Sequence, residues 1–391
     1  MPVPFPWIKN PHHWIDKGDT VIGLAPMEGV SDFPFRRWVS LCSTASYHST
    51  PFLRVTDTFP HKDLPVDFAP EILDSDYKDR IETPVVLQVM GPSPERIIKA
   101  GKLILDHTNY FDINFGCPAP TVVGRGSGSA LLSNPDNFKN FVSEIYENLP
   151  ENSFSIKIRT GYEDDSNYES IINSIEHMNL KRLTIHGRTK VEKYMGFANW
   201  DHIELAAKKL QIPVVGSGDV SNKKTYEERL SKAPSISGVI IGRAAQKNPW
   251  IFDSIKAESP KTVSFEQILN CALVYGCYIE VFFGRGYEEF KKIDLELGMI
   301  QKPLSEKEWE QYLKSFAMKA FATDKIEDMP IERRALSRIK MIWTHMKDIL
   351  PEEFHDRTLL RAKTCKDFIE AFRIAQKSSI ERTGQNEISV H

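Results

Sequence analysis

The sequence predicts an α/β protein, with a TIM (β/α)8 barrel over residues 21–258 followed by a C-terminal all-helical domain. Three observations support this fold class. Eight short apolar runs alternate with amphipathic stretches, polar residues follow the ends of these runs, and only helical patterns remain after residue 260. Parallel strands that alternate with helices over roughly 240 residues fit such a barrel. An open doubly wound sheet fits less well, because the first run is followed by APMEGVSD and not by GxGxxG.

The predicted strands are short and apolar. In chain order they are VIGLAP, ASYHSTPFL, PVVLQVMG, YFDINFG, SFSIKIRTG, RLTIHGRT, IPVVGSGDV and GVIIGRAA. The helical candidates between them include DFPFRRWVSLC, SPERIIKAGKLILDH, NPDNFKNFVSEIYENL, NYESIINSIEHM and WDHIELAAKKL. Several begin with Ser, Asn or Asp, which are the residues that cap helix N-termini. Only the connection at 54–84, which is rich in Pro and Asp, lacks a clear helix.

The chain around the barrel divides into three further segments. Residues 1–20 are an N-terminal extension without the pattern of a secretory signal. Residues 259–380 carry helical patterns and are expected to form a separate domain. Residues 381–391 are polar and are expected to be a disordered tail. Within the helical domain, 331–366 contains nine Lys or Arg and five Asp or Glu, which favours contact with RNA phosphates over a merely solvated helix face.

Composition restricts the class of protein. The net charge of −3 gives no whole-chain indication of nucleic-acid binding. The five cysteines are scattered and form no CxxC pair, which argues against a disulfide framework and against a zinc site. We therefore expect no metal, and a reducing, cytoplasmic location. The longest apolar stretch, CALVYGCYIEVFFG, is too short to cross a bilayer and contains Glu280, so no membrane is expected.

Polar residues gather at the ends of the predicted strands. They are Gln88, Asn114, Cys117, Lys157, Arg159, His186, Arg188, Ser217, Asp219 and Arg243. Any one of them is simply explained as a helix cap or a surface group. In a barrel, however, these ends meet at one mouth, where active sites lie. GSGDV and IGRAA, after the last two strands, favour a phosphate site over plain tight turns.

Cys117 lies between Gly116 and Pro118, and three roles are considered for it. A metal ligand would need partners that the sequence lacks. A buried structural thiol stays possible. A free thiol has a pKa of about 8.5, so it is mostly protonated at neutral pH and is able to act as a general acid. A nucleophile would instead want a base beside it.

The motifs LAPMEGVSD, LQVMG, DINFGCP, GSGSALL, KIRTGY, IHGRTK, VVGSGDV and IGRAAQKNP occur in this order. With them, residues 21–258 resemble the tRNA-dihydrouridine synthases. STPFLRV, HGRTKVEKY and RIKMIW are most similar to the dihydrouridine synthase C branch, which acts on position 16 of the D-loop. The resemblance implies a monomeric FMN-dependent reductase that uses NADPH to convert a tRNA uridine to 5,6-dihydrouridine. It also implies that the helical domain binds tRNA.

The resemblance assigns roles residue by residue. Cys117 would give the proton to uracil C5 after hydride reaches C6, and the uridine must leave its stack to enter the barrel mouth. The residues near the flavin ring would be Pro26, Met27, Glu28, Gln88, Lys157 and His186. Those at its phosphate end would be Ser217, Gly218, Asp219, Gly242 and Arg243. Those that meet tRNA would be Arg54, Asn114, Arg188, Tyr194, Arg338, Lys340 and Arg361.

The sequence departs from the family pattern in several places, which include an acidic stretch at 291–311 and about 20 extra residues before the barrel. Ser217 stands where the family usually has Asn, and APTVV after Cys117 lacks a Lys that is often found there. Three alternatives therefore stay open. They are a flavin reductase of a free enone or pyrimidine, a dihydrouridine synthase for another RNA class, and a non-catalytic flavin-containing RNA-binding protein.

Overall fold

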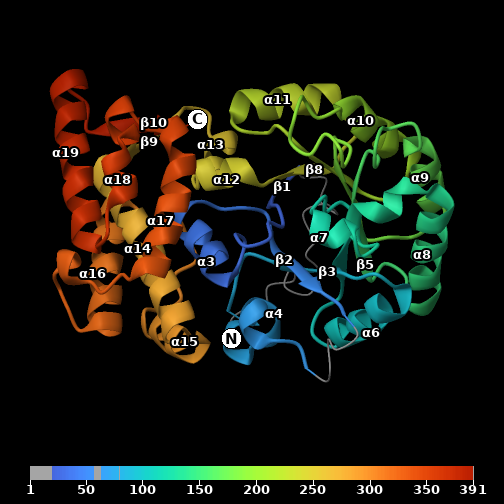
Figure 1. Cartoon of the computed structure of the whole chain (residues 1–391), viewed down its shortest axis with the longest axis horizontal. Helices are drawn as coiled ribbons and strands as arrows, with labels where there is room; N and C mark the ends of the chain where they lie inside the picture. Colours follow the sequence, from blue (N-terminus) through green and yellow to red (C-terminus); the bar gives the residue numbers. More distant parts are fainter. Residues whose placement is uncertain (1–19, 57–62, 79, 391) are drawn as a thin grey trace. The chain divides into compact units, whose positions relative to one another are not determined.

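The computed structural model describes residues 20–56, 63–78 and 80–390, and it divides into two compact units (Figure 1). Of the described residues, the barrel unit comprises those up to Phe33 and those between Ala45 and Gly242, and the helical unit comprises Pro34–Thr44 and those from Arg243 onward. The division therefore falls earlier than the predicted boundary at 258. The helical unit also takes in most of α3 (Phe33–Cys42), which the sequence pattern assigns to the barrel.

Specific contacts explain why α3 belongs with the helical unit. Trp38 Nε1 donates to the carbonyl of Cys271, which lies in α14 (Phe265–Gly284), at 2.9 Å. Arg37 pairs with Asp294 at 2.8 Å, and both side chains are buried. Burial lowers the pKa of Arg37, but the adjacent Asp294 carboxylate outweighs this and holds it above its usual value. A buried ion pair of this kind is costly to break, so it fixes α3 to this unit.

Eight parallel strands form a closed barrel in chain order, which confirms the predicted fold class. They are β1 (Val21–Leu24), β2 (His48–Arg54), β3 (Val85–Met90), β4 (Phe111–Asn114), β5 (Phe154–Arg159), β6 (Leu183–His186), β7 (Val214–Ser217) and β8 (Gly238–Ile241). Most strand residues are buried, as expected where helices cover one face of a parallel barrel and side chains fill the other. β1 and β8 close the barrel at Gly238, where a Cβ atom would lie 2.3 Å from the Val21 carbonyl oxygen.

The helices of the barrel unit follow the predicted pattern. They are α6 (Pro94–Leu105), α8 (Pro135–Asn148), α9 (Tyr168–Ile175), α10 (Trp200–Lys209) and α11 (Lys223–Lys232), with short α4 (Pro70–Leu73), α5 (Ser75–Lys78) and α7 (Pro120–Val123). Asn134, Asn199 and Asn222 cap α8, α10 and α11 by accepting backbone N–H groups. Short 3₁₀ segments, η1 (Val66–Phe68) and η2 (Gly128–Ser133), complete the connections.

The helical unit is built around α14, whose residues are nearly all buried. Around it are α12 (Arg243–Lys247), α13 (Ile251–Lys256), α15 (Tyr287–Glu296), α16 (Glu306–Phe321), α17 (Arg333–Met346), α18 (Arg357–Arg361) and α19 (Cys365–Thr383). Short turns η3 (Ile326–Asp328), η4 (Lys347–Ile349) and η5 (Glu352–His355) link them. α14 is long and apolar enough to cross a membrane, but 83% of its most apolar window is buried in the fold, as in the core helix of a globular unit.

The prediction of a disordered tail at 381–391 is wrong for the residues that the structure describes. α19 continues to Thr383, and Gly384 ends it in the left-handed conformation. β10 (Glu387–Val390) then pairs antiparallel with β9 (Lys261–Ser264). Ile388 and Val390 are buried, and the polar residues between and before them are exposed. This alternation of apolar and polar side chains, with a period of two residues, is typical of a strand.

Candidate functional site

The carboxyl ends of the barrel strands bring most of the predicted site residues together. Electrostatic interactions join Cys117, after β4, to Glu28 after β1, Arg54 at the end of β2 and Lys157 in β5. These residues are far apart in sequence, and the closed barrel makes them neighbours. The predicted mouth is therefore a real cluster of ionisable and polar side chains.

A chain of buried hydrogen bonds crosses from β5 to the Cys117 segment. Ser155 Oγ donates to Asp112 Oδ1 at 2.5 Å, and Gln88 Nε2 donates to Asp112 Oδ2 at 2.6 Å. Asn114 Nδ2 then donates to Gln88 Oε1 at 2.7 Å. Asn114 Oδ1 accepts the backbone N–H groups of Gly116 and Cys117, both at 2.9 Å.

This series of hydrogen bonds fixes the orientation of the side-chain amides of Gln88 and Asn114. Gln88 Nε2 donates to Asp112 and Gln88 Oε1 accepts from Asn114, so Gln88 turns its NH2 group toward the carboxyl and its oxygen toward Asn114. Asn114 must in turn present its oxygen to the backbone of Cys117. Asp112 and Ser155 are not among the residues that the sequence predicts for the site, although they hold this network together. The signal was present, because Asp112 and Asn114 are two residues apart on one strand and therefore share a face.

Replacing Asp112 with alanine is expected to lower the free energy of unfolding by about 2 kcal/mol, because Gln88 Nε2 and Ser155 Oγ lose their buried acceptor. Urea denaturation measures this loss. Asp106→Ala, at an exposed helix end, is the matched control and should change stability by less than about 0.5 kcal/mol. Equal effects of the two substitutions would show that the buried chain adds no stability.

The Cys117 thiol lies in an apolar setting. It is 9% exposed and packs with Phe52, Met90 and Val122. Its backbone carbonyl accepts the Ser129 hydroxyl at 2.8 Å. Burial is the main cause that raises the pKa of the thiol, so Cys117 is protonated at neutral pH. This state suits a general acid and does not suit a nucleophile.

Lys157 supplies a positive charge beside this thiol. Burial, followed by the nearby charge of Arg159, lowers the pKa of Lys157 to about 8. Within the part of the chain that the structure describes, its Nζ atom forms no hydrogen bond or ion pair. A half-buried ammonium without such a partner is available to an electron-rich ligand at the mouth.

The ends of β6 and β7 bring five more predicted residues together. His186 Nδ1 lies 3.4 Å from Ser217 Oγ. Arg188 forms two hydrogen bonds from Nη2 to Asp219, at 2.7 and 2.9 Å. Gly218 (φ +124°) and Asp219 (φ +57°) both adopt positive φ, which makes the turn that faces Arg188 and His186. Arg188 Nη1 is buried without a hydrogen-bond partner among the described residues. This N–H donor, which lies beside the turn, is therefore available to a ligand.

Arg159 links three segments around the mouth. Its Nε atom donates to the Gly116 carbonyl at 2.8 Å, and its Nη1 atom donates to the carbonyls of Thr189 and Lys193 at 2.9 and 3.0 Å. Its guanidinium also lies over the Tyr194 ring, 5.8 Å from the centroid. Arg159 therefore ties the segment before Cys117 to the loop after β6.

The remaining predicted residues lie at the end of β2 and directly after β1 and β8. Glu28 and Arg54 form an ion pair at 2.7 Å that is partly exposed to solvent. Met27, after Pro26, exchanges hydrogen bonds with the Ser31 hydroxyl. Gly242 follows β8 directly, and Arg243 begins α12, which belongs to the helical unit.

Three residues predicted to meet tRNA lie in the helical unit. Arg338 Nε donates to the Tyr275 hydroxyl at 3.1 Å. Lys340 Nζ donates to the Ala362 carbonyl, which gives this lysine a structural role. Arg361 is exposed at the end of α18.

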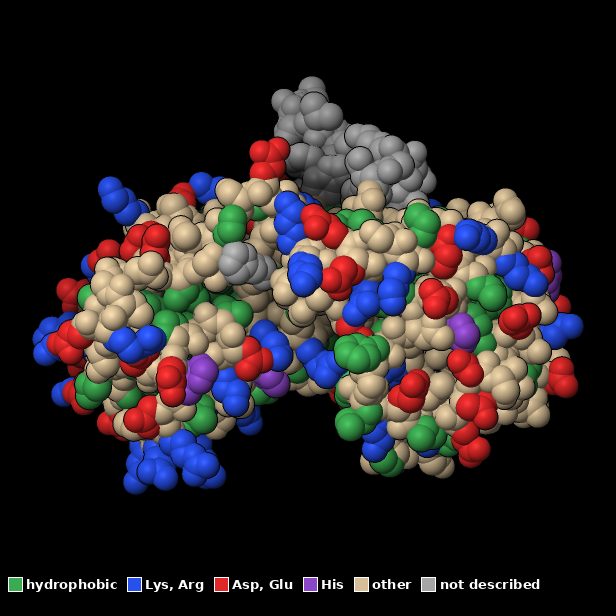
Figure 2. Space-filling view, turned by 90° about the horizontal axis from the view of Figure 1, so that it is seen from above, with side chains coloured by type: hydrophobic (Ala, Val, Ile, Leu, Met, Phe, Trp, Pro, Cys, Tyr) green, Lys and Arg blue, Asp and Glu red, His purple; other side chains and the backbone are tan. Residues whose placement is uncertain are grey.

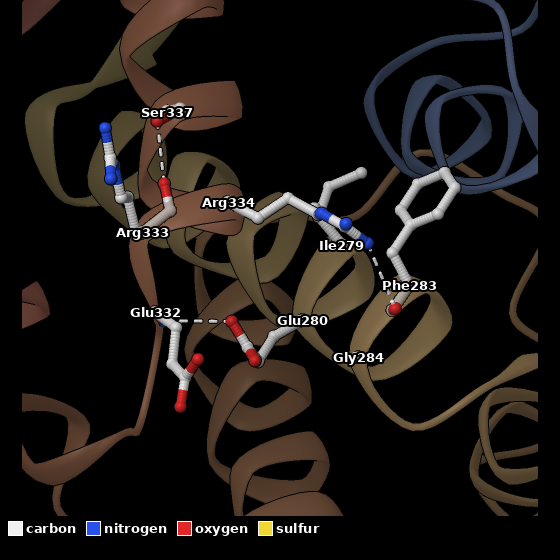
Figure 3. Close-up of a pocket in the computed structure, with 8 residues that line it drawn as sticks. All are labelled: Ile279, Glu280, Phe283, Gly284, Glu332, Arg333, Arg334 and Ser337. Carbon is white, nitrogen blue, oxygen red and sulfur yellow. Dashed lines mark hydrogen bonds between the residues drawn. The ribbon is translucent and has the colours of Figure 1, made fainter.

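A surface pocket in the helical unit lies between the end of α14 and the start of α17 (Figure 3). It is lined by Ile279, Glu280, Phe283, Gly284, Glu332, Arg333, Arg334 and Ser337. Glu280 accepts the backbone N–H of Glu332 at 2.8 Å, and Arg334 donates to the Phe283 carbonyl at 3.2 Å. Glu280 of α14 thus binds the backbone at the start of α17, and Arg334 of α17 binds the backbone at the end of α14.

A metal centre is not found among residues 20–56, 63–78 and 80–390, because no group of three His, Cys, Asp or Glu side chains there is suited to hold an ion. The arrangement at the mouth is one of a protonated thiol, a cation with a lowered pKa and buried donors. Such a set serves proton donation and the binding of an electron-rich ligand.

Known proteins are similar to the part of the chain that contains the barrel and this site. A sequence profile of the family described as "Dihydrouridine synthase (Dus)" matches residues 23–335. The chain is 31% identical over 263 residues to a "Probable tRNA-dihydrouridine synthase" of Aquifex aeolicus, covering 66% of this chain and 78% of that protein. It is 33% identical over 241 residues to "tRNA-dihydrouridine synthase B" of Escherichia coli, covering 59% and 70%. The solved structure of the old yellow enzyme from Trypanosoma cruzi is similar with a TM-score of 0.42 and 10% identity, over 61% of this chain and 88% of that chain.

Proposed function

The chain belongs to the dihydrouridine synthase family, and on this premise we propose that it reduces a specific uridine of tRNA to 5,6-dihydrouridine. We propose FMN as its bound cofactor, NADPH as the reductant and Cys117 as the proton donor. One observation carries this proposal. A thiol that burial keeps protonated lies within electrostatic reach of Lys157 at the mouth of a closed barrel. Reduction of a C=C bond conjugated to a carbonyl needs such a proton donor.

The residues at the mouth fit a flavin mononucleotide. The ammonium of Lys157 suits the electron-rich edge of the ring, and the buried Nη1 of Arg188 is a donor that awaits an acceptor. The ring would be lined by Pro26, Met27, Glu28, Gln88, Lys157 and His186. The phosphate end would be held by Ser217, Gly218, Asp219, Gly242 and Arg243, where glycine-rich turns leave backbone N–H groups accessible.

When bound, reduced FMN would supply the hydride that adds to C6 of the uracil ring. The protein residues complete the reaction, with Cys117 giving its proton to C5. Asn114 uses one amide hydrogen for Gln88, which leaves its second N–H to bind a uracil carbonyl where charge develops. The uridine must leave its base stack to reach this mouth, and Tyr194 stands at the rim to meet it.

We further propose that the helical unit positions the tRNA. Lys and Arg side chains gather at one margin of this unit, at the lower left of Figure 2. Arg361 and Arg338, together with Arg54 of the barrel unit, would contact tRNA phosphates or bases. Arg188 is 2% exposed, so we assign it to the flavin and not to the tRNA. Lys340 is assigned a weaker contact, because its ammonium already binds Ala362. The C-branch resemblance supports position 16 of the D-loop as the target. The enzyme would act as a cytoplasmic monomer.

The rate of flavin reduction is expected to fall as the pH rises above about 8. Lys157 is charged below its pKa of about 8 and neutral above it, so the cation that stabilises an anionic reduced ring is lost on the alkaline side. Stopped-flow reduction by NADPH between pH 6.5 and 10 measures this. Lys157→Arg should flatten the fall, and Lys157→Met should be slow at every pH. A Lys157→Met profile like that of the unmodified enzyme would contradict the assignment.

The proposed function is tested with purified protein, NADPH and unmodified tRNA transcripts. We expect a yellow protein that releases FMN on denaturation and forms dihydrouridine at position 16, mapped by sequencing of the product. Dihydrouridine at another position would refute the C-branch assignment alone. Rapid turnover of free uracil that Arg361→Glu does not change would favour the free-pyrimidine reductase instead.

A further inference from the structure

The loop between β6 and α10 exposes a cluster of apolar side chains. The described chain has nine exposed large hydrophobic residues, and four of them fall within residues 191–197. Val191 and Tyr194 are about half exposed, while Met195 and Phe197 are 76% and 84% exposed. Single exposed hydrophobic side chains are ordinary on protein surfaces, but a local cluster indicates a contact surface.

This loop is held in place by buried groups. Arg188 is 2% exposed, and it donates to the Met195 carbonyl at 3.0 Å and to the Gly196 carbonyl at 2.6 Å. Asp219, which pairs with Arg188, also accepts the backbone N–H of Ala198 at 2.6 Å. The backbone on both sides of Phe197 is therefore fixed. Met195 and Phe197 are held out toward solvent by an ordered loop.

The same loop is attached, through Arg159, to the segment that carries Cys117. Arg159 binds the carbonyls of Lys193 and of Gly116, the residue before Cys117. The Tyr194 ring lies edge-on to the His186 ring, with 6.3 Å between centroids. The exposed side chains therefore stand at the rim of the mouth that would receive the uridine.

We propose that Met195 and Phe197 form a stacking surface for an unpaired nucleobase of the tRNA, one that neighbours the uridine drawn into the barrel. The inference rests on the proposed function. A uridine that leaves its stack exposes the faces of its neighbours, and an aromatic side chain replaces the lost stacking. Lys190 and Lys193 precede Met195 in the same loop and suit the adjoining phosphates. Two side chains on a narrow rigid loop match the size of one base better than a protein interface, which needs a broad face.

The test uses the holoenzyme and an unmodified tRNA transcript. Phe197→Ser is expected to lower kcat/KM for dihydrouridine formation about tenfold, and to weaken tRNA binding by the oxidised enzyme to a similar degree. Phe197→Trp should restore both, because its ring also stacks. NADPH-driven flavin reduction should not change. Ile374→Ser is the matched control, since Ile374 is 68% exposed on α19 of the helical unit, and it should change neither quantity.

Several outcomes would overturn the inference. An effect of Phe197→Ser no larger than that of Ile374→Ser would exclude stacking. Restoration of binding by Phe197→Leu to the same degree as by Phe197→Trp would exclude it as well. A concentration-dependent change of mass in ultracentrifugation, abolished by Phe197→Ser, would identify a second copy of the chain as the occupant. The proposed function and the proposed stacking surface are tested by different measurements, so the failure of one is distinguishable from the failure of the other. If the unmodified enzyme forms no dihydrouridine, the proposed function fails, while a tenfold binding loss in Phe197→Ser would still support stacking on RNA.

Discussion

Cys117→Ala is expected to lower the rate of dihydrouridine formation by about 10²–10⁴-fold, the usual contribution of a general acid. Alanine cannot donate a proton, and burial holds the thiol of Cys117 in its protonated form at neutral pH. Flavin binding and reduction by NADPH should continue, because neither step needs this proton. The measurement is a single turnover, in which reduced enzyme is mixed with tRNA and flavin oxidation and dihydrouridine are followed together.

Cys365→Ala is the matched control for loss of a thiol. Cys365 is also buried, but it lies in the helical unit, where its Sγ contacts the Ile326 carbonyl. Its removal should leave the single-turnover rate within about twofold. A Cys117→Ala enzyme that makes dihydrouridine at the unmodified rate would rule out the thiol as the acid. Loss of flavin reduction in the same variant would point instead to a structural role.

The substitution Arg159→Met is expected to lower the free energy of unfolding by about 3 kcal/mol and dihydrouridine formation by about 10²-fold. Three carbonyls, those of Gly116, Thr189 and Lys193, would lose their charged donor at once. Burial lowers the pKa of Arg159 to about 10, so the guanidinium is still charged at neutral pH. Without it, the segment before Cys117 and the loop after β6 lose their common attachment.

Urea denaturation and the single-turnover assay measure these two effects. Lys139→Met, which removes an exposed cation from α8, is the control and should change neither by a measurable amount. Arg159→Lys should behave more like Arg159→Met than like the unmodified enzyme, because an ammonium lacks the planar fork that reaches three carbonyls. A normal rate in a destabilised Arg159→Met enzyme would show that the attachment serves stability alone.

The fold, and the gathering of polar side chains at one end of the barrel strands, were predictable from local patterns. Each barrel strand is a short, largely buried segment of four to seven residues, and several of the helices after these strands begin at an Asn cap that the sequence displays. Polar side chains at strand ends then had to meet at one mouth, because parallel strands in a closed barrel share their direction. Cys117 and Lys157 could therefore be placed near each other without knowledge of any contact.

The tail and the unit boundary could not be predicted in the same way. Residues 387–390 are strand-forming only because β9 offers them a partner more than a hundred residues earlier in the chain. α3 was assigned to the barrel by its position after β1, but the pairing of Arg37 with Asp294 joins it to the helical unit. In both cases the deciding interaction spans a long sequence separation, which local periodicity does not record.

The sequence by itself determined the barrel, the order of its strands and the candidate general acid, because strand periodicity, helix caps and a thiol between Gly116 and Pro118 are local features. Only the tertiary structure decided how these groups are oriented. Asp112 sets the amide of Gln88, and Arg159 binds Gly116 and Lys193, through hydrogen bonds between strands and loops that are 24 to 43 residues apart in the chain. Their physical basis is the register of neighbouring strands, which exists only once the barrel is closed.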